Sequence, residues 1–67
     1  MFKVDIQDNE SQCEINIIYS IKFESDISIP LRTLTKESLE KEIDMAKGRL
    51  LELVVKEAIN EKGLLNV

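Results

Sequence analysis

The hydrophobic pattern of this chain changes its period near residue 34, and that change constrains the fold more than any other feature. Before it, apolar and polar residues alternate, with the apolar residues on even positions over 2–6 and on odd positions over 13–23. From Thr35 onward, apolar residues recur every three or four positions. Alternation is typical of half-buried strands, and the longer period is typical of a helix. The sequence therefore predicts an α+β fold in which strands come first and one helix comes last.

The alternating part predicts three antiparallel strands. Their expected ranges are about 2–7, 12–23 and 27–33. Two short polar segments rich in turn-forming residues, Asp8–Ser11 and Glu24–Asp26, separate them. Pro30 has no N–H to donate to a neighbouring strand, which places the third strand at an edge of the sheet. We therefore expect a meander with the strand order 1-2-3.

The change of parity across the first turn predicts a register. If Asp8 pairs with Ser11, Ile6 lies opposite Cys13, and the apolar residues of both strands share one face. On the other face, this register places Asp5 opposite Glu14. That outer face is expected to be mostly polar and solvated, with three bases on it. These bases are Lys3, Lys22 and Arg32.

The second half of the chain predicts one helix over about 36–62. Thr35 is a residue type that caps helix N-termini, and Gly63 is a type that ends helices. Gly48 interrupts the helix, either as a tolerated surface glycine or as a point of close backbone approach or bending. A narrow apolar stripe is expected to face the sheet. It comprises Leu39, Ile43, Ala46, Leu50 and Leu53. Together these elements form one domain over residues 1–67.

A chain of 67 residues buries little apolar surface and needs a further source of stability. Its single cysteine cannot form an internal disulfide, and it has no Cys/His cluster for a structural metal. We therefore expect a homodimer formed through the C-terminal half of the helix and the tail, where apolar residues spread beyond one stripe. The expected interface comprises Leu51, Val54, Val55, Ala58, Ile59, Leu64 and Leu65. Alternatively, the helix flank of Leu51, Val55 and Ile59 forms a groove for the helix of another protein.

The sequence lacks the residues on which most catalysis depends. There is no histidine, the commonest general base, and therefore no Ser/His or Cys/His pair. Cys13 belongs to the inward-facing set of its strand and is expected to be a buried apolar residue. No phosphate-binding glycine loop and no calcium-binding carboxylate spacing occurs. We expect a protein that is not an enzyme and that has no cofactor and no metal site.

The negative charge is concentrated in the first half of the chain. The net charge is −4, and residues 1–30 hold six acids and two lysines, whereas residues 31–67 hold seven acids and seven bases. Because phosphate binding depends on Lys and Arg, we expect no direct contact with nucleic acid. The expected partner is a basic protein, such as one that binds nucleic acid itself. No apolar segment reaches the roughly 18 residues of a membrane span and no signal peptide is evident, which predicts a cytoplasmic protein without a membrane partner.

The acidic cluster around the first turn is the best candidate for a functional surface. Three interpretations are open: an ordinary solvated face, a cation site, and a docking surface for a basic partner. The docking interpretation assigns partner binding to six carboxylates. They belong to Asp5, Asp8, Glu10, Glu14, Glu24 and Asp26.

We therefore expect a small protein-binding module. The favoured hypothesis is an acidic inhibitor of the kind that phages encode, a DNA mimic that occupies the nucleic-acid-binding surface of a basic protein in the host cytoplasm. The alternative is a regulatory or antitoxin-like subunit that binds through the apolar helix flank and the C-terminal tail. A dimeric nucleic-acid binder that uses Lys3, Lys22 and Arg32 is the least favoured hypothesis, because these bases form no patch.

One resemblance accompanies the antitoxin alternative. The strand-strand-strand-helix order and the acidic bias are similar to those of HicB-type antitoxin domains, and Ser38–Glu42 resembles the start of their helix. The glycine-rich turn and the proline-containing loop usual in that family are absent from this chain.

Overall fold

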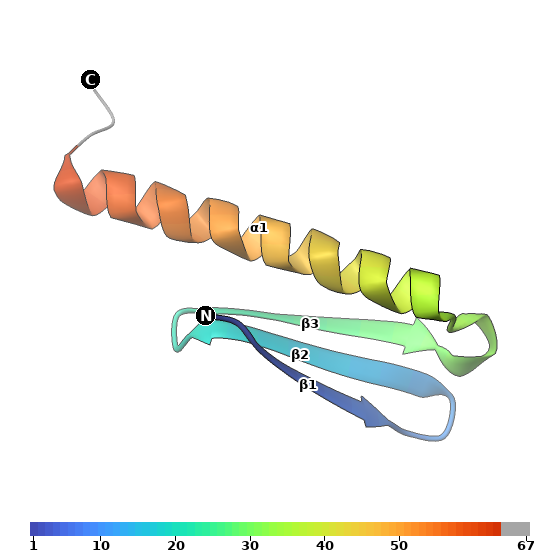
Figure 1. The fold of residues 1–67 in the computed structure, drawn as a ribbon. Helices are drawn as coiled ribbons and strands as arrows, with labels where there is room; N and C mark the ends of the chain where they lie inside the picture. The colour runs from blue at the N-terminus through green and yellow to red at the C-terminus, as the bar shows by residue number, and fades with distance from the viewer. Residues whose placement is uncertain (64–67) are drawn as a thin grey trace.

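The structure, a computed structural model, describes residues 1–63, which form a three-stranded sheet with one long helix across it (Figure 1). Its elements are β1 (Lys3–Asp8), β2 (Gln12–Ser20), β3 (Phe23–Pro30), a 3-10 turn (Leu31–Thr33) and α1 (Lys36–Lys62). The sheet is antiparallel and has the order β1-β2-β3. The predicted α+β class, the meander, the edge position of the third strand and the bounds of the helix are confirmed.

Both ends of α1 are closed by the residues that the sequence indicated. At the start, Thr35 Oγ1 accepts a hydrogen bond from Ser38 N at 3.0 Å, and Thr35 N donates one to Ser38 Oγ at 2.9 Å. This reciprocal capping box gives partners to N–H groups that the helix itself leaves free. At the other end, Gly63 takes a left-handed conformation with φ of 68°, which glycine adopts without steric cost.

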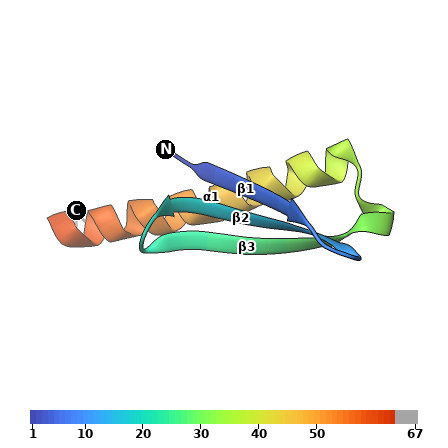
Figure 2. The ribbon, with the colours of Figure 1, turned by 90° about the horizontal axis from the view of Figure 1, so that it is seen from below.

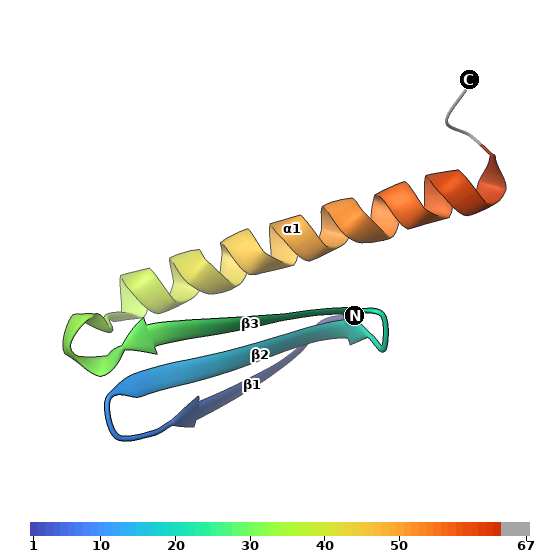
Figure 3. The ribbon, with the colours of Figure 1, turned by 180° about the vertical axis from the view of Figure 1, so that it is seen from behind.

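The core lies between α1 and one face of the sheet. Its buried residues are Cys13, Ile15, Ile17, Ile29, Ala46 and Leu50. The helix packs over β2 and β3 and extends past the end of the sheet (Figures 1 and 3). Two apolar side chains are therefore less covered than the pattern predicts, because Leu53 is 50% exposed and Ile6, on the core face of β1, is 48% exposed. Over residues 1–63, no helix combines the length and the apolar character that crossing a membrane requires.

The register of the first hairpin differs from the prediction by two residues. Asp8 pairs with Cys13 and Asp5 pairs with Asn16, so Asp5 does not lie opposite Glu14. The loop is longer than expected because Asn9 closes it: Asn9 N donates to Gln12 O at 2.9 Å, and Asn9 Oδ1 accepts from Gln12 N at 3.0 Å. A shift of two residues keeps every side chain on its face, so the predicted division between core and outer residues holds.

The second turn lies at Ile21–Lys22 and not at Glu24–Asp26, so β2 ends at Ser20 and Phe23 begins β3. Ile18 pairs with Glu24 and Ser20 with Phe23, which leaves Tyr19 as the extra residue of a β-bulge. A two-residue turn alone would pair odd-numbered residues of one strand with even-numbered residues of the other. The extra residue in β2 restores the pairing of odd with odd, so the odd-numbered residues of both strands face the core. β3 ends at Pro30, three residues earlier than predicted, and the chain continues into the 3-10 turn.

Candidate functional site

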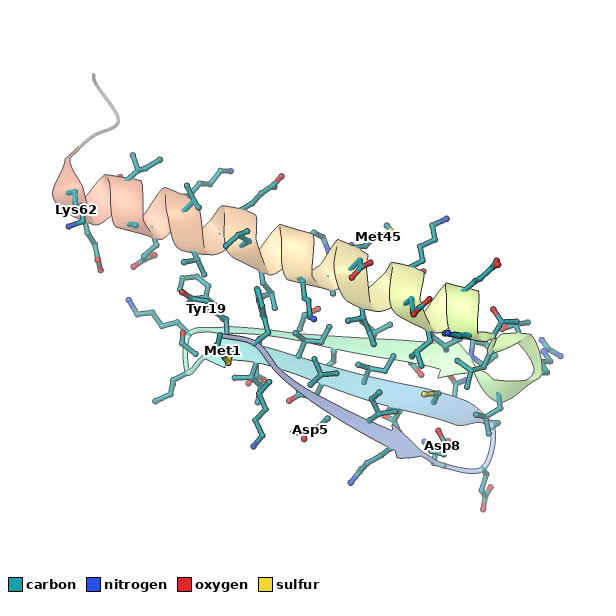
Figure 4. The ribbon with its side chains drawn as sticks, viewed as in Figure 1. Met1, Asp5, Asp8, Tyr19, Met45 and Lys62 are labelled. Carbon is teal, nitrogen blue, oxygen red and sulfur yellow. The ribbon has the colours of Figure 1, made fainter. Side chains whose placement is uncertain are left out.

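The face of the sheet turned away from α1 is acidic, and Figure 2 views the molecule from this side. Four exposed carboxylates lie on it, and we call this set the acidic face. It comprises Asp5 from β1, Glu14 from β2, and Glu24 and Asp26 from β3. Figure 4 shows Asp5 projecting from the side of the sheet opposite α1. Among the described residues of the three strands, Lys3 is the one basic side chain on this face.

Asn16 lies at the centre of the acidic face, between two of its carboxylates. It pairs with Asp5 across β1 and with Asp26 across β3, and its Nδ2 donates to Asp26 Oδ1 at 2.7 Å. In the next row, Glu14 lies between Gln7 and Ser28. A shallow hollow of about 400 Å³ crosses these two rows. The acidic face is therefore an ordered polar surface in which amide and hydroxyl groups separate the charges.

Two bases that were expected on the outer face lie elsewhere. Lys22, in the second turn, reaches the helix, where its Nζ lies 3.0 Å from Glu57 Oε1. The hydrogen bond that Lys22 donates to Glu57, together with the negative charge of Glu57, raises the pKa of Lys22 above the ordinary value. Arg32 lies in the 3-10 turn and lines a separate hollow with Glu10. The acidic face is consequently more negative than the sequence predicts.

The structure brings together four of the six predicted carboxylates. Glu24 and Asp26, which were expected in a turn, lie within β3 on the same face as Asp5 and Glu14. Asp8 is on the core face at the edge of β1, and Glu10 is at the first hairpin.

Gln7 and Ser28, which lie in the same row as Glu14 on the acidic face, are not among the residues that the sequence predicts for the site. The alternation of the flanking apolar residues is a signal that would have placed both on the outer face.

Cys13 lies beneath the helix and is 1% exposed, as the sequence predicts. Burial raises the pKa of the Cys13 thiol above its ordinary value of 9.0, and the hydrogen bond and charge of Asp8 raise it further. The thiol is therefore protonated at neutral pH, and the protonated form is not the nucleophile. Across residues 1–63, no three or more His, Cys, Asp or Glu side chains are grouped so that they could hold a metal ion.

A second surface lies on α1, on the side turned away from the sheet. Three large apolar side chains are about half exposed there: Met45 (47%), Leu51 (49%) and Val55 (47%). Leu51 and Val55 line a hollow of about 370 Å³ beside Gly48, and Figure 4 shows Met45 pointing away from the sheet. Of the other residues expected at a dimer interface, Ala58 is exposed, and Val54 and Ile59 are half-buried. Leu64 and Leu65 lie outside the described residues.

Comparisons of the chain with protein families, with curated proteins and with solved structures find no match. Both surfaces are therefore interpreted from their own geometry and charge.

Proposed function

We propose that this protein is a non-catalytic binding module whose acidic face docks on the basic, nucleic-acid-binding surface of another protein, and that it acts as a nucleic-acid mimic. The observation that carries the proposal is the placement of four exposed carboxylates and one lysine on a single sheet face. A surface of one charge sign accelerates encounter with an oppositely charged partner and rejects partners of the same sign.

The order of the acidic face supports a docking role. The four carboxylates stand on paired strands, and two of them accept side-chain hydrogen bonds, Asp26 from Asn16 and Glu14 from Asn9. Diagonal neighbours on adjacent strands, such as Asp5 and Glu14, lie about 7–8 Å apart between backbones. A preorganised array of this kind loses little side-chain entropy when lysine and arginine side chains of a partner bind to it.

The test is affinity capture from a bacterial lysate with the wild-type protein and two double variants. The first variant, Asp5→Lys with Asp26→Lys, reverses the charge on both sides of Asn16. The control, Glu37→Lys with Glu40→Lys, makes the same change in net charge at exposed positions of α1. We expect the wild type and the control to retain a basic nucleic-acid-binding protein that elutes between about 0.2 and 0.5 M salt, because salt screens surface charge pairs in that range.

Competition with nucleic acid is the second measurement, because a nucleic-acid mimic occupies the same surface of the partner. The purified protein should displace nucleic acid from the captured partner, and the acidic-face variant should not. Equal retention of the partner by both variants would contradict the proposal. A partner held at high salt would favour the regulatory-subunit alternative, because an apolar contact through Leu51 and Val55 is not screened.

A further inference from the structure

The exposed side of α1 carries a heptad pattern that the core does not use. Six positions follow one another at alternating intervals of four and three residues, which is the spacing of a coiled-coil seam. These residues, here called the seam, are Asp44, Gly48, Leu51, Val55, Ala58 and Lys62. All six are exposed. The seam is apolar or small at its centre, with an acid at one end and a base at the other.

We propose that two copies of this chain pack through the seam as an antiparallel helix pair. In this arrangement Leu51 of each copy lies against Val55 of the other, Gly48 lies against Ala58, and Asp44 lies against Lys62. Each end of the interface then carries one ion pair, and the small residues allow the two helices to approach closely. The paired region runs from residue 44 to residue 62 and is about 27 Å long, at 1.5 Å per residue.

The end charges select this register and this direction. A parallel pair would bring Asp44 against Asp44 and Lys62 against Lys62, which is repulsive at both ends. An antiparallel pair shifted by seven residues would place Leu51 against Lys62 or Val55 against Asp44, which removes both the apolar match and the ion pairs. Of these alternatives, the proposed register alone matches every seam position with a residue of complementary character.

Side chains next to the seam extend the apolar contact. At the positions that flank an antiparallel seam, Met45 falls beside Ile59 of the second copy, and Val54 falls beside Val54. Lys47 Nζ lies 5.9 Å from the centre of the Phe2 ring, so the β1 edge of the sheet is on the seam side of α1. Ile6, 48% exposed on the core face of β1, lies on this same side. These apolar side chains widen the contact beyond the seam itself.

Self-association would also add stability to a fold with little buried apolar surface. The six buried residues found within 1–63 make a small core, and short chains commonly gain stability by oligomerising. Binding of a second folded copy stabilises the native state by mass action, so the melting temperature should rise with protein concentration. This inference does not rest on the proposed function.

Analytical ultracentrifugation of the full chain tests the interface. We expect the wild type to change from monomer to dimer over the micromolar to millimolar range, and Leu51→Lys to weaken the dimer at least about tenfold, as burial of a charge at an interface centre does. Leu53→Lys is the matched control, because Leu53 is exposed to the same extent (50%) but lies outside the seam. Circular dichroism verifies that both variants are folded. A wild type that is monomeric throughout, or equal losses in the two variants, would overturn the proposal.

A charge swap tests the register. Asp44→Lys or Lys62→Asp alone should weaken the dimer about tenfold, because two ion pairs become two like-charge contacts. The double variant, Asp44→Lys with Lys62→Asp, restores both pairs and should recover wild-type affinity. In a parallel dimer, the wild type, both single variants and the double variant would all carry like charges at both ends, so neither single change would weaken the dimer. Single changes without effect, or a double variant as weak as the single ones, would therefore reject the antiparallel register.

Discussion

At the scale of single residues, burial decides the chemistry of the one cysteine. Cys13 points into the core from the central strand, and Asp8 lies opposite it at the edge of the sheet. Both features favour the neutral thiol, and burial is the larger of the two causes. The side chain therefore contributes to packing and not to reactivity.

This burial predicts a loss of stability at alkaline pH. Below the ordinary thiol pKa of 9.0, Cys13 is protonated in both the folded and the unfolded chain, and its contribution to stability is fully present. Above 9.0, the unfolded chain releases the proton and the folded chain keeps it, so the free energy of unfolding falls as the pH rises toward the folded pKa. Urea unfolding near neutral pH and about one unit above 9.0 measures the change.

The Cys13→Ala variant is the control, because it removes the titrating group and should lose less stability over the same interval. The raised pKa of Lys22 acts in the same direction, but from 10.5 upward, so the interval just above 9.0 isolates the thiol. A thiol reagent should modify native Cys13 only as fast as the protein opens. Rapid labelling of the native protein would contradict the burial of this side chain.

The N-cap residue is the second position where one side chain has a measurable effect. Thr35→Ala removes the acceptor for Ser38 N and should lower the free energy of unfolding by about 0.5–2 kcal/mol. Thr35→Ser keeps the hydroxyl and should retain most of that stability. Urea unfolding of the two variants measures the difference, and an equal loss in both would show that the hydroxyl does not cap the helix.

At the scale of elements, the bounds of the helix and the place of the first turn were predictable, and the place of the second turn was not. Thr35 begins α1 because its side chain accepts a hydrogen bond from a free backbone N–H, and Gly63 ends α1 because glycine adopts the left-handed conformation easily. Both ends therefore follow from residue type. The second turn, at Ile21–Lys22, is made of residues with no turn preference, and the apolar alternation runs through it. A turn at Glu24–Asp26 would also have kept odd-numbered residues on the core face, so parity could not choose between the two.

Parity likewise limited what could be predicted of the acidic face. Alternation predicted that Asp5 and Glu14 face outward, because that depends only on parity. It could not predict that Asn16 lies between Asp5 and Asp26, because this depends on the register of both hairpins. That register is determined by the closure of the first loop around Asn9 and by the bulge at Tyr19. Both are single local features, and a repeating hydrophobic pattern does not reveal them.

The two glycines of the helix predict opposite effects of the same substitution. A Cβ at Gly48 would meet nothing within 4 Å, so no other part of the described chain approaches it, and Gly48→Ala should raise the stability of the monomer by about 1 kcal/mol. Gly63→Ala should lower it by about 1 kcal/mol, because Gly63 has a φ of 68°. Thermal unfolding in dilute solution checks both, and a loss at Gly48 would indicate a close contact at that position.

At the scale of the whole molecule, the two surfaces are separated by chemistry and by element. The sheet presents charge to solvent on the face away from α1, and the helix presents apolar side chains on its own outer side. This division leaves the acidic face free when a second copy covers the seam. Docking and self-association can therefore be measured independently, through variants that change one surface and leave the other unchanged.

Repulsion between the carboxylates of the acidic face should lower the stability of the folded state. The four carboxylates are exposed and lie within a few strand spacings of one another, so they repel each other weakly in the native sheet. The neutral variant, with Asp5→Asn, Glu14→Gln, Glu24→Gln and Asp26→Asn, removes that repulsion and keeps an oxygen acceptor for Asn16. It should be more stable than the wild type by a few tenths to about 1 kcal/mol at low salt.

Melting temperatures of the two proteins at low and high salt test this cost. The advantage of the neutral variant should shrink as salt rises, because screening already weakens the repulsion in the wild type. The same variant should lose the basic partner, since the charges that destabilise the sheet are the ones that the proposed partner binds. A neutral variant whose melting temperature is well below that of the wild type at both salt concentrations would instead assign these carboxylates a structural role. The acidic face would then be explained by its contribution to stability, without a partner.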